Sequence, residues 1–317
     1  MQYRTYGNTN VSLSVIGLGG HEYLPNGSSR GFNEHRGEAV KPGYVGEGYG
    51  GPQRLAVLET ALHNGVNFFD VTIDPEKEAL GRNLREVTIP HDIFIQTRPE
   101  GMGYGYDPGN RKMADGKLLR QEVQRCLKLL QRDVIDILNF PFLQSALDED
   151  PDYLSKIRDN VASLKEAKLI RFASADNFSG ESTYLAQIES GIFDSISINF
   201  NFADTLARAK VFPTAHAEGM GIITREVFQK GRLFTMGEEA AITDRSLLAR
   251  TALKWNLSVP QVTTALVGAE NPDQLTNALS ILDDPSLGKD DSETLERLVA
   301  TTSGQKFHQS KKTSFRS

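Results

Sequence analysis

Short apolar runs alternate with longer amphipathic segments along most of this chain. The runs are rich in Val, Ile and Phe, as buried strands are, and they lie near 14–18, 66–70, 93–97, 134–138, 169–173, 195–199, 221–224 and 262–267. Between them, apolar residues recur at intervals of three and four, which is typical of helices with one buried stripe. This alternation indicates β/α units that build a parallel sheet.

The number of units favours a closed barrel. Eight predicted strands, each followed by a helix, are what a (β/α)₈ TIM barrel requires. An open doubly wound sheet is the competing fold, but no predicted strand leads into a G-x-G-x-x-G turn. We therefore expect residues 1–317 to form a single α/β barrel domain. The sequence YRTYGNTNVSLSV (3–15) predicts a β-hairpin that caps the bottom of that barrel.

Two segments depart from this regular pattern. Residues 20–52 form a long Gly-rich insertion after the first predicted strand, with three tyrosines and two histidines. In a barrel this loop emerges on the active-site face, where long loops usually serve function. The tail at 302–317 is polar and basic, so we expect a weakly ordered or surface-lying end.

Composition narrows the class of partner. The net charge of −6 and pI near 5.6 argue against a broad basic face for nucleic acid, so small molecules are the expected partners. A single cysteine excludes an internal disulfide framework. No signal peptide or long apolar run is present, which predicts a cytoplasmic protein that is not in the membrane. The oligomeric state has no signature in the sequence.

Several segments resemble one family in order and spacing. They are YGNTNVSLSVIGLGG, ALHNGVNFFDVT, EKEALGRNL, IFIQTR, KEAKLIRFASADNFS and LVGAENPDQL. Together they resemble the aldo-keto reductases over about residues 2 to 285. The resemblance implies a (β/α)₈ enzyme that reduces carbonyl compounds with NAD(P)H.

The catalytic positions implied by this resemblance are mostly altered. In the family a tyrosine donates the proton, with lysine, aspartate and histidine around it. Asp70 matches the aspartate, whereas the stretch 71–75, where the tyrosine is expected, contains no phenol. Arg98 replaces the lysine, and Asn139 or Pro141 stands at the histidine position. The chain therefore resembles a divergent member.

Asp70 and Arg98 follow neighbouring predicted strands, so we expect them at one rim of the barrel. One interpretation is a buried ion pair that orders the mouth. The other gives Arg98 a fixed charge for a carboxylate, phosphate or oxyanion, with Asp70 as acceptor or base. Arginine does not readily release a proton, so a different group must act as the acid.

The insertion offers candidates for the missing acid. His21 or Tyr23 could fold back over the mouth and supply the proton, or the segment could serve as a lid. His21, Glu22, His35 and Asp74 lack metal-ligand spacing, so no metal site is predicted.

The resemblance also implies the cofactor positions, which are Asp176, Asn177, Ser197, Phe200, Arg225, Lys230, Glu270 and Gln274. Of the Ser-Asn pair that holds the nicotinamide carboxamide, only Asn177 is kept, and Phe200 stands at the stacking aromatic. Arg225 and Lys230 bring positive charge to the pyrophosphate loop. Relatives that prefer NADP have a basic residue for the 2′-phosphate at the position of Glu270. A carboxylate there repels that phosphate, which favours NAD over NADP.

These observations leave three hypotheses. The first is an aldo-keto reductase-like NAD(P)-dependent oxidoreductase with a rearranged proton donor, acting on a polar or anionic carbonyl or hydroxyl compound. The second is a non-redox lyase, dehydratase or isomerase that uses Asp70 as base and Arg98 to stabilise an enolate. The third is a catalytically silent homologue that binds a nucleotide or a protein. The first accounts for most of the matched positions.

Overall fold

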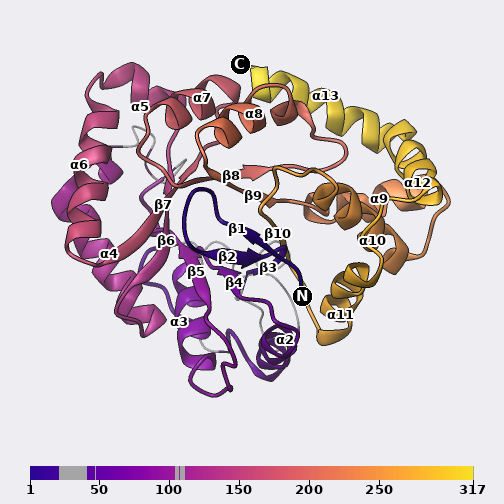
Figure 1. Ribbon diagram of the computed structural model, residues 1–317, viewed down its shortest axis with the longest axis horizontal. Coiled ribbons are helices and arrows are strands. Elements are labelled where there is room, and N and C mark those ends of the chain that lie inside the picture. Colours follow the sequence, from indigo (N-terminus) through magenta and orange to yellow (C-terminus); the bar gives the residue numbers. More distant parts are fainter. Residues whose placement is uncertain (21–40, 47, 104–106, 108–110, 317) are drawn as a thin grey trace.

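The computed structural model of the chain describes residues 1–20, 41–46, 48–103, 107 and 111–316. Its centre is a closed barrel of parallel strands, surrounded by helices (Figure 1). The barrel strands are β3 (Ile16–Gly19), β4 (Phe68–Asp70), β5 (Phe94–Thr97), β6 (Ile135–Pro141), β7 (Ile170–Asp176), β8 (Ser195–Asn199), β9 (Gly221–Arg225) and β10 (Thr264–Val267). They follow chain order around the ring, and β10 pairs with β3 to close it. The predicted eight-stranded (β/α)₈ barrel is confirmed.

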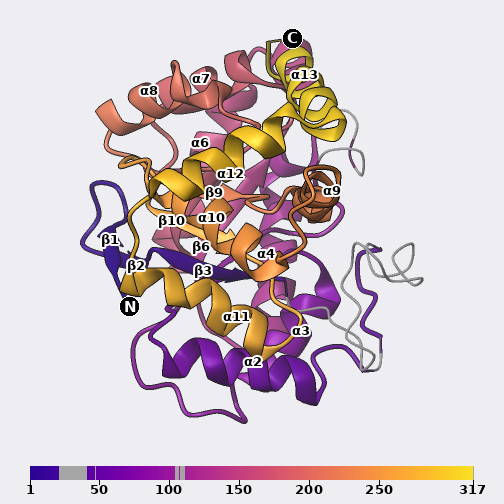
Figure 2. The same ribbon diagram turned by 90° about the vertical axis from the view of Figure 1, so that its right-hand side faces the viewer.

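The hairpin at the chain start is also confirmed. Strand β1 (Tyr3–Thr5) pairs antiparallel with β2 (Ser12–Ser14) and lies across one end of the barrel (Figures 1 and 2). Between the two strands Tyr6 inserts its fully buried ring, and its hydroxyl donates to Ser195 Oγ at 2.6 Å. The hairpin thus covers part of the end where the barrel strands begin.

Helices connect the strands and cover the outside of the barrel. They are α2 (Pro52–His63), α3 (Asp74–Asn83), α4 (Gly116–Leu130), α5 (Gln144–Glu149), α6 (Tyr153–Glu166), α7 (Glu181–Glu189), α8 (Val211–Ala217), α9 (Arg232–Glu239), α10 (Arg245–Leu257), α11 (Pro272–Leu279), α12 (Lys289–Ala300) and α13 (Thr302–Arg316). Short 3₁₀ turns lie at Lys112–Ala114, Leu206–Arg208, Gln229–Gly231 and Ser280–Asp283. Among the described residues, no helix is both long and apolar enough to cross a membrane.

The apolar core has two main parts, besides a small cluster of Tyr49, Ile73 and Ala79. The larger one lies between the strands and the surrounding helices and includes Ile16, Leu58 and Val123. The smaller one fills the bottom of the barrel interior, where Tyr6, Leu13, Phe68, Phe94, Ile137, Ile223 and Leu266 meet beneath the hairpin. The barrel interior is therefore packed at this end, and a site inside the barrel can form only toward the carboxyl ends of the strands.

Two strands extend beyond their predicted limits. Strand β6 continues to Pro141 and β7 to Asp176, three residues past the predicted ends at 138 and 173. Six residue pairs link these two strands in register, from Ile135 with Ile170 to Pro141 with Asp176. As a result, Asn139 and Asp176 are strand residues at the mouth of the barrel rather than loop residues beyond it.

The C-terminal segment forms helix α13, which lies along the outside of the molecule (Figure 2). Phe307 is buried, and Ser303 donates its backbone N–H to Glu239 Oε2 at 3.0 Å. Lys311 Nζ lies 3.5 Å from Asp204 Oδ2, and His308 Nδ1 donates to the carbonyl of Ala203 at 3.1 Å. The polar and basic sequence therefore belongs to a helix that lies on the surface and is tied to α9 and to the loop after β8.

Candidate functional site

Polar side chains collect inside the barrel near the carboxyl ends of its strands. They are Asp70 on β4, Gln96 on β5, Asn139 on β6, Ser174 and Asp176 on β7, Ser197 and Asn199 on β8, and Arg225 on β9. Every second residue of a barrel strand faces inward, and hydrogen bonds between strands that are not neighbours show that these residues do so. Because the strands are parallel, they share one rim, where (β/α)₈ enzymes carry their active sites.

Asp70 is held at this rim by a chain of hydrogen bonds. Its Oδ1 accepts from Gln96 Nε2 at 2.8 Å, and Gln96 Oε1 accepts from Ser197 Oγ at 3.3 Å. Ser197 Oγ lies 3.1 Å from Ser174 Oγ, so the chain crosses the barrel. Gln96, Ser174 and Ser197 are buried. The carboxyl group of Asp70 is thereby fixed in orientation.

The surroundings of Asp70 make its carboxyl a weaker acid than an ordinary aspartic acid. Asp70 keeps a small exposed surface, but the barrel walls surround its carboxyl, and this burial raises the pKa to about 6. The carboxylate of Glu76 adds to the rise, whereas the hydrogen bond from Gln96 and the charges of Arg225 and Arg98 oppose it. A carboxyl with a pKa near neutrality can both give and accept a proton at ordinary pH.

Arg98 directly follows β5, the parallel neighbour of β4. The register pairs Asp70 with Gln96, so Arg98 stands two residues farther along toward the mouth. Its charge opposes the rise in the pKa of Asp70, as the smallest of the effects on that carboxyl. Both residues therefore belong to one rim, and Arg98 brings a permanent positive charge to it.

A buried ion pair lies at the same rim. Arg225 Nη1 donates to Asp176 Oδ2 at 2.6 Å, and Nη2 donates to Oδ1 of the same carboxylate. Asp176 is fully buried and also accepts from Asn139 Nδ2 at 3.3 Å, while Arg225 Nε donates to Asn199 Oδ1 at 2.8 Å. The half-exposed ring of Phe178 lies over the guanidinium, 5.1 Å away. This bidentate geometry holds Arg225 rigidly.

Two residues matched to the nicotinamide end of the cofactor are engaged inside the protein. Asn177 Nδ2 donates to Gln187 Oε1 at 3.0 Å, and its Oδ1 accepts two backbone N–H groups just before α7. The ring of Phe200 is fully buried, with Phe212 and Trp255 at 4.7 and 5.1 Å. Phe200 therefore offers no open face in this conformation, contrary to the expectation for a stacking aromatic.

The loop after β9 has an unusual backbone. Glu226, Gln229 and Lys230 adopt positive φ angles of 57°, 53° and 55°, and Gly231 follows with 89°. Such conformations are costly for residues with a Cβ and cluster at ligand sites. Lys230 is exposed and pairs with Glu226 at 2.9 Å. Gln229 is fully buried, and neither polar atom of its amide finds a hydrogen-bond partner in the described part of the chain.

Glu270 and Gln274 meet at the start of α11. The backbone N–H of Glu270 donates to Gln274 Oε1 at 2.9 Å, and the backbone N–H of Gln274 donates to Asn271 Oδ1 at 2.9 Å. Gln274 is exposed and Glu270 is partly so. Both side chains stand at the surface, where Glu270 contributes a negative charge.

The remaining catalytic candidates are His21 and Tyr23, which lie outside the described residues. Asp74, considered above for a metal, is instead buried at the start of α3, with Lys77 Nζ at 2.9 Å and Arg125 as a second partner. No cluster of three or more potential metal ligands occurs among the residues that the structure describes. The start of α3 thus holds an internal ion-pair network.

The stretch where a tyrosine was expected is a helix start. Helix α3 begins at Asp74 with Pro75 in its first turn, and Glu76 Oε2 accepts from the backbone N–H of Ile73 at 3.1 Å. Glu76 also accepts from the hydroxyl of Thr72 at 3.1 Å. The residues that follow Asp70 therefore cap a helix.

Comparisons with known proteins place the chain in a family. The model of the Aldo/keto reductase family matches residues 44–246, and the chain therefore belongs to this family. Membership supports, in general, an NAD(P)-dependent oxidoreductase acting on a small molecule.

Among solved structures, the chain is similar to the aldo-keto reductase AKR11C1 from Bacillus halodurans in its holo form. The TM-score is 0.70 at 17% sequence identity, covering 94% of this chain and 96% of that one. At this identity the likeness speaks for the fold. No curated protein matches the sequence.

Sequence reasoning missed three features of the rim: the link from Asp70 to Gln96, the pair of Asp176 with Arg225, and the contribution of Asn199. A signal was present, because the strands FASAD and SISIN have polar residues at every second position. That period places those residues on one face of each strand. It does not state which of them meet.

Proposed function

We propose that this protein is an NAD(P)-dependent oxidoreductase for a small polar or anionic carbonyl or hydroxyl compound, in which Asp70 exchanges the proton. The observation that carries the proposal is the Asp70 carboxyl at the barrel mouth, with a pKa raised to about 6 beside two arginines. Such a group combines proton transfer near neutrality with a preference for anionic substrates.

Each residue of the rim then has a chemical task. In the reductive direction protonated Asp70 donates to the substrate oxygen, and in the oxidative direction the ionised carboxylate takes that proton back. Gln96 fixes the orientation of the carboxyl through its 2.8 Å hydrogen bond. Arg98 remains charged and stabilises negative charge on the substrate oxygen or on a substrate carboxylate. The nicotinamide cofactor, when bound, supplies or accepts the hydride.

The loop after β9 supports retention of a dinucleotide. Its positive-φ residues turn the backbone sharply before α9, and Lys230 is exposed. The buried amide of Gln229 has no hydrogen-bond partner among the residues that the structure describes. Backbone N–H groups at a helix start, together with a cation, suit a pyrophosphate. Glu270 would repel a 2′-phosphate, so we propose NAD in preference to NADP.

Contacts among the residues matched to the nicotinamide end of the cofactor support a second candidate function. Asp176 and Arg225 pair with each other, Asn177 is engaged with Gln187, and Phe200 is covered. These contacts favour a non-redox lyase, dehydratase or isomerase, in which Asp70 removes a proton and Arg98 stabilises the enolate. Both candidates use the same carboxyl group, but only the first needs a nicotinamide.

Cofactor titration separates the two candidates. NADH and NADPH are added to the full-length protein while nicotinamide fluorescence is followed. Saturable binding, tighter for NADH and weakened about tenfold by Lys230→Ala, supports the oxidoreductase. Glu270→Arg is the matched variant, because it should improve NADPH binding alone. Absence of binding at millimolar cofactor would remove the oxidoreductase and leave the non-redox enzyme or a silent barrel.

The role of Asp70 is tested by substitution once a substrate is found. Asp70→Asn keeps the size of the side chain but cannot transfer a proton, so turnover should fall about 100- to 10,000-fold. Tyr23→Phe and His21→Ala are the comparison variants, since either residue stays a predicted alternative donor. A large loss in one of these, with Asp70→Asn nearly unaffected, would assign the proton to the insertion instead.

A further inference from the structure

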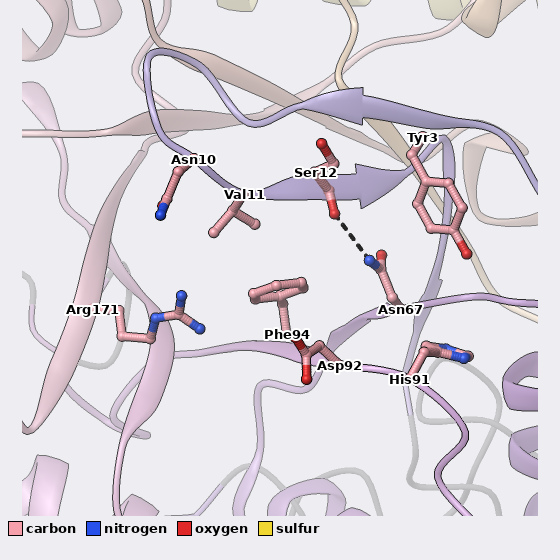
Figure 3. A pocket seen from close by; sticks show the side chains of 9 residues that line it. All are labelled: Tyr3, Asn10, Val11, Ser12, Asn67, His91, Asp92, Phe94 and Arg171. Carbon is pink, nitrogen blue, oxygen red and sulfur yellow. Dashed lines mark hydrogen bonds between the residues drawn. The ribbon is translucent and has the colours of Figure 1, made fainter.

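A second pocket lies at the opposite end of the barrel, beside the hairpin (Figure 3). Its volume is about 470 Å³, which is within the range of small-molecule sites. Tyr3, Asn10 and Ser12 line it from the hairpin, and Asn67, Phe94 and Arg171 line it from the entries to β4, β5 and β7. The hairpin covers the barrel bottom only in part, and the pocket occupies the uncovered side.

The walls of this pocket are held in place without a ligand. Asn67 binds the hairpin through its side chain, accepting from the backbone N–H of Ser14 at 2.7 Å and donating to the carbonyl of Ser12 at 2.9 Å. Tyr3 donates its hydroxyl to a backbone carbonyl at 2.9 Å, and His91 Nε2 does the same at 3.0 Å. A ligand would therefore meet a preformed surface, which limits the entropic cost of binding.

Positive charge predominates at one end of the pocket. Asp136 is almost fully buried and serves two guanidinium groups, Arg171 Nη1 at 3.0 Å and Arg132 Nη2 at 3.2 Å. One carboxylate cannot neutralise both, so the cluster of Arg171, Arg132 and Asp136 carries one excess positive charge at this end, and the carboxylate of Asp92 elsewhere in the lining balances it overall. Arg171 is 42% exposed, and in Figure 3 its side chain extends toward Phe94, with Asn10 on the hairpin side of it.

Apolar surface lies next to this charge. Phe94 and Val11 belong to the barrel-bottom core and retain 8% and 5% exposure at the pocket. The guanidinium of Arg171 lies 5.3 Å from the centre of the Phe94 ring. Asp92 is the acidic lining residue, and in Figure 3 it lies on the side of Phe94 away from the hairpin. The pocket thus offers a cation and a small apolar floor together.

From this arrangement we propose that the pocket beneath the barrel binds a small organic carboxylate. The carboxylate meets the free edge of the Arg171 guanidinium and the amide of Asn10, while the apolar body lies on Phe94 and Val11. The site is independent of the catalytic rim, because the packed barrel bottom separates the two ends. Occupancy couples the hairpin to β5 and β7 and so stabilises the folded chain.

Isothermal titration of the full-length protein tests the proposal, with benzoate as the probe and acetate as the probe without an apolar body. Benzoate should bind saturably and acetate at least about tenfold more weakly. Arg171→Gln should weaken benzoate binding about tenfold or more. Arg132→Gln leaves Asp136 to neutralise Arg171 alone, so it should weaken benzoate binding, but less than Arg171→Gln does. The matched control is Arg111→Gln, an exposed arginine paired with Glu149 outside the pocket, which should leave binding within about twofold.

A further variant tests the site if Arg171→Gln does not fold. Asn10→Ala changes an exposed hairpin residue and should weaken benzoate binding while the circular dichroism spectrum is retained. No saturable benzoate binding to the wild type at about 10 mM, or equal binding by the wild type and both pocket variants, would overturn the site. Equal affinities for benzoate and acetate would overturn the role given to Phe94 and Val11.

Discussion

The two ends of the barrel interior are built from opposite kinds of side chain. At the bottom, Phe68, Phe94, Ile137 and Ile223 pack together beneath the hairpin. Two residues farther along the same strands, the corresponding side chains are Asp70, Gln96, Asn139 and Arg225. The step of two keeps each pair on one face of its strand. The same backbone therefore carries an apolar plug at one end and a charged rim at the other.

This contrast shows how the barrel divides its tasks. The bottom buries apolar surface, and its interior hydrogen bond from Tyr6 to Ser195 is satisfied. The rim holds a carboxyl with a raised pKa and a buried Asn139 Oδ1 that has no partner among the described residues. Such groups reduce stability, and they persist where a site needs them. We expect loss of an apolar side chain at the bottom to lower stability, and removal of the ionisable carboxyl of Asp70 at the rim to raise it.

The largest effect is expected at the bottom. Phe68→Ala empties space beneath the hairpin at a fully buried position and should lower the free energy of unfolding by about 3–5 kcal/mol. Urea denaturation followed by circular dichroism measures it. Dinucleotide binding by the folded fraction should remain, because the rim is untouched. A loss below about 1 kcal/mol would mean that the bottom is not the stabilising end.

A somewhat smaller loss is expected when the buried ion pair is broken. Asp176→Asn leaves Arg225 without its carboxylate, which should cost about 3 kcal/mol of unfolding free energy. The freed charge of Arg225 should also lower the pKa of Asp70, moving the pH profile of activity to lower pH. Asn199→Ala, which removes only one bond to Arg225, is the milder comparison. An unchanged profile in Asp176→Asn would show that Arg225 does not act on Asp70.

Substitution of Asp70 should raise the free energy of unfolding, whereas the two substitutions above lower it. The pKa of Asp70 is about 6 when folded, against an ordinary value of 3.8, so the folded state binds the proton more tightly. The stabilisation by the neutral form is complete below about pH 4 and is lost as pH rises through about 6. Asp70→Asn should therefore stabilise the protein at pH 7, on the order of 3 kcal/mol, and change little at about pH 4. The free energy of unfolding of the wild type and of Asp70→Asn is measured at both pH values. An equal difference between the two proteins at both pH values would contradict the raised pKa.

The smallest effect concerns the polar contact within the bottom plug. Tyr6→Phe removes the hydroxyl that binds Ser195 and leaves the serine without that donor. The expected loss of unfolding free energy is about 1 kcal/mol, well below that for Phe68→Ala. Adding Ser195→Ala should recover part of the loss, since both polar partners are then gone. A loss as large as that for Phe68→Ala would assign the bottom's stability to this hydrogen bond.

The same contrast explains what could be predicted. Apolar periodicity located each barrel strand to within a few residues, since strand and helix periods differ and each buried element must show its own. Asp70 and Arg98 could be assigned to one rim because parallel strands end on one side. The partners could not be read, because Asp176 and Arg225 lie 49 positions apart and meet only across the closed barrel.

The resemblance to the family was most informative for features that the backbone determines, such as the barrel. It was least informative for residues whose role depends on the side chains packed around them. Phe200 remains aromatic, but Phe212 and Trp255 cover it. Asn177 is kept, yet its amide is bound to Gln187. Residue identity does not reveal such engagement, because it depends on side chains contributed by distant elements.

By itself, the sequence determined the β/α order, the hairpin and the supply of polar residues to the strand ends, because local periodicity and turn chemistry act over a few neighbouring residues. Only the tertiary structure decided that Asp70 would be joined to Gln96 and Ser197, that Arg225 would be held by Asp176, and that a pocket would remain beside the hairpin. These features depend on ring closure, which brings distant strands within hydrogen-bonding distance, and on burial, which changes the acidity of a carboxyl without changing its identity.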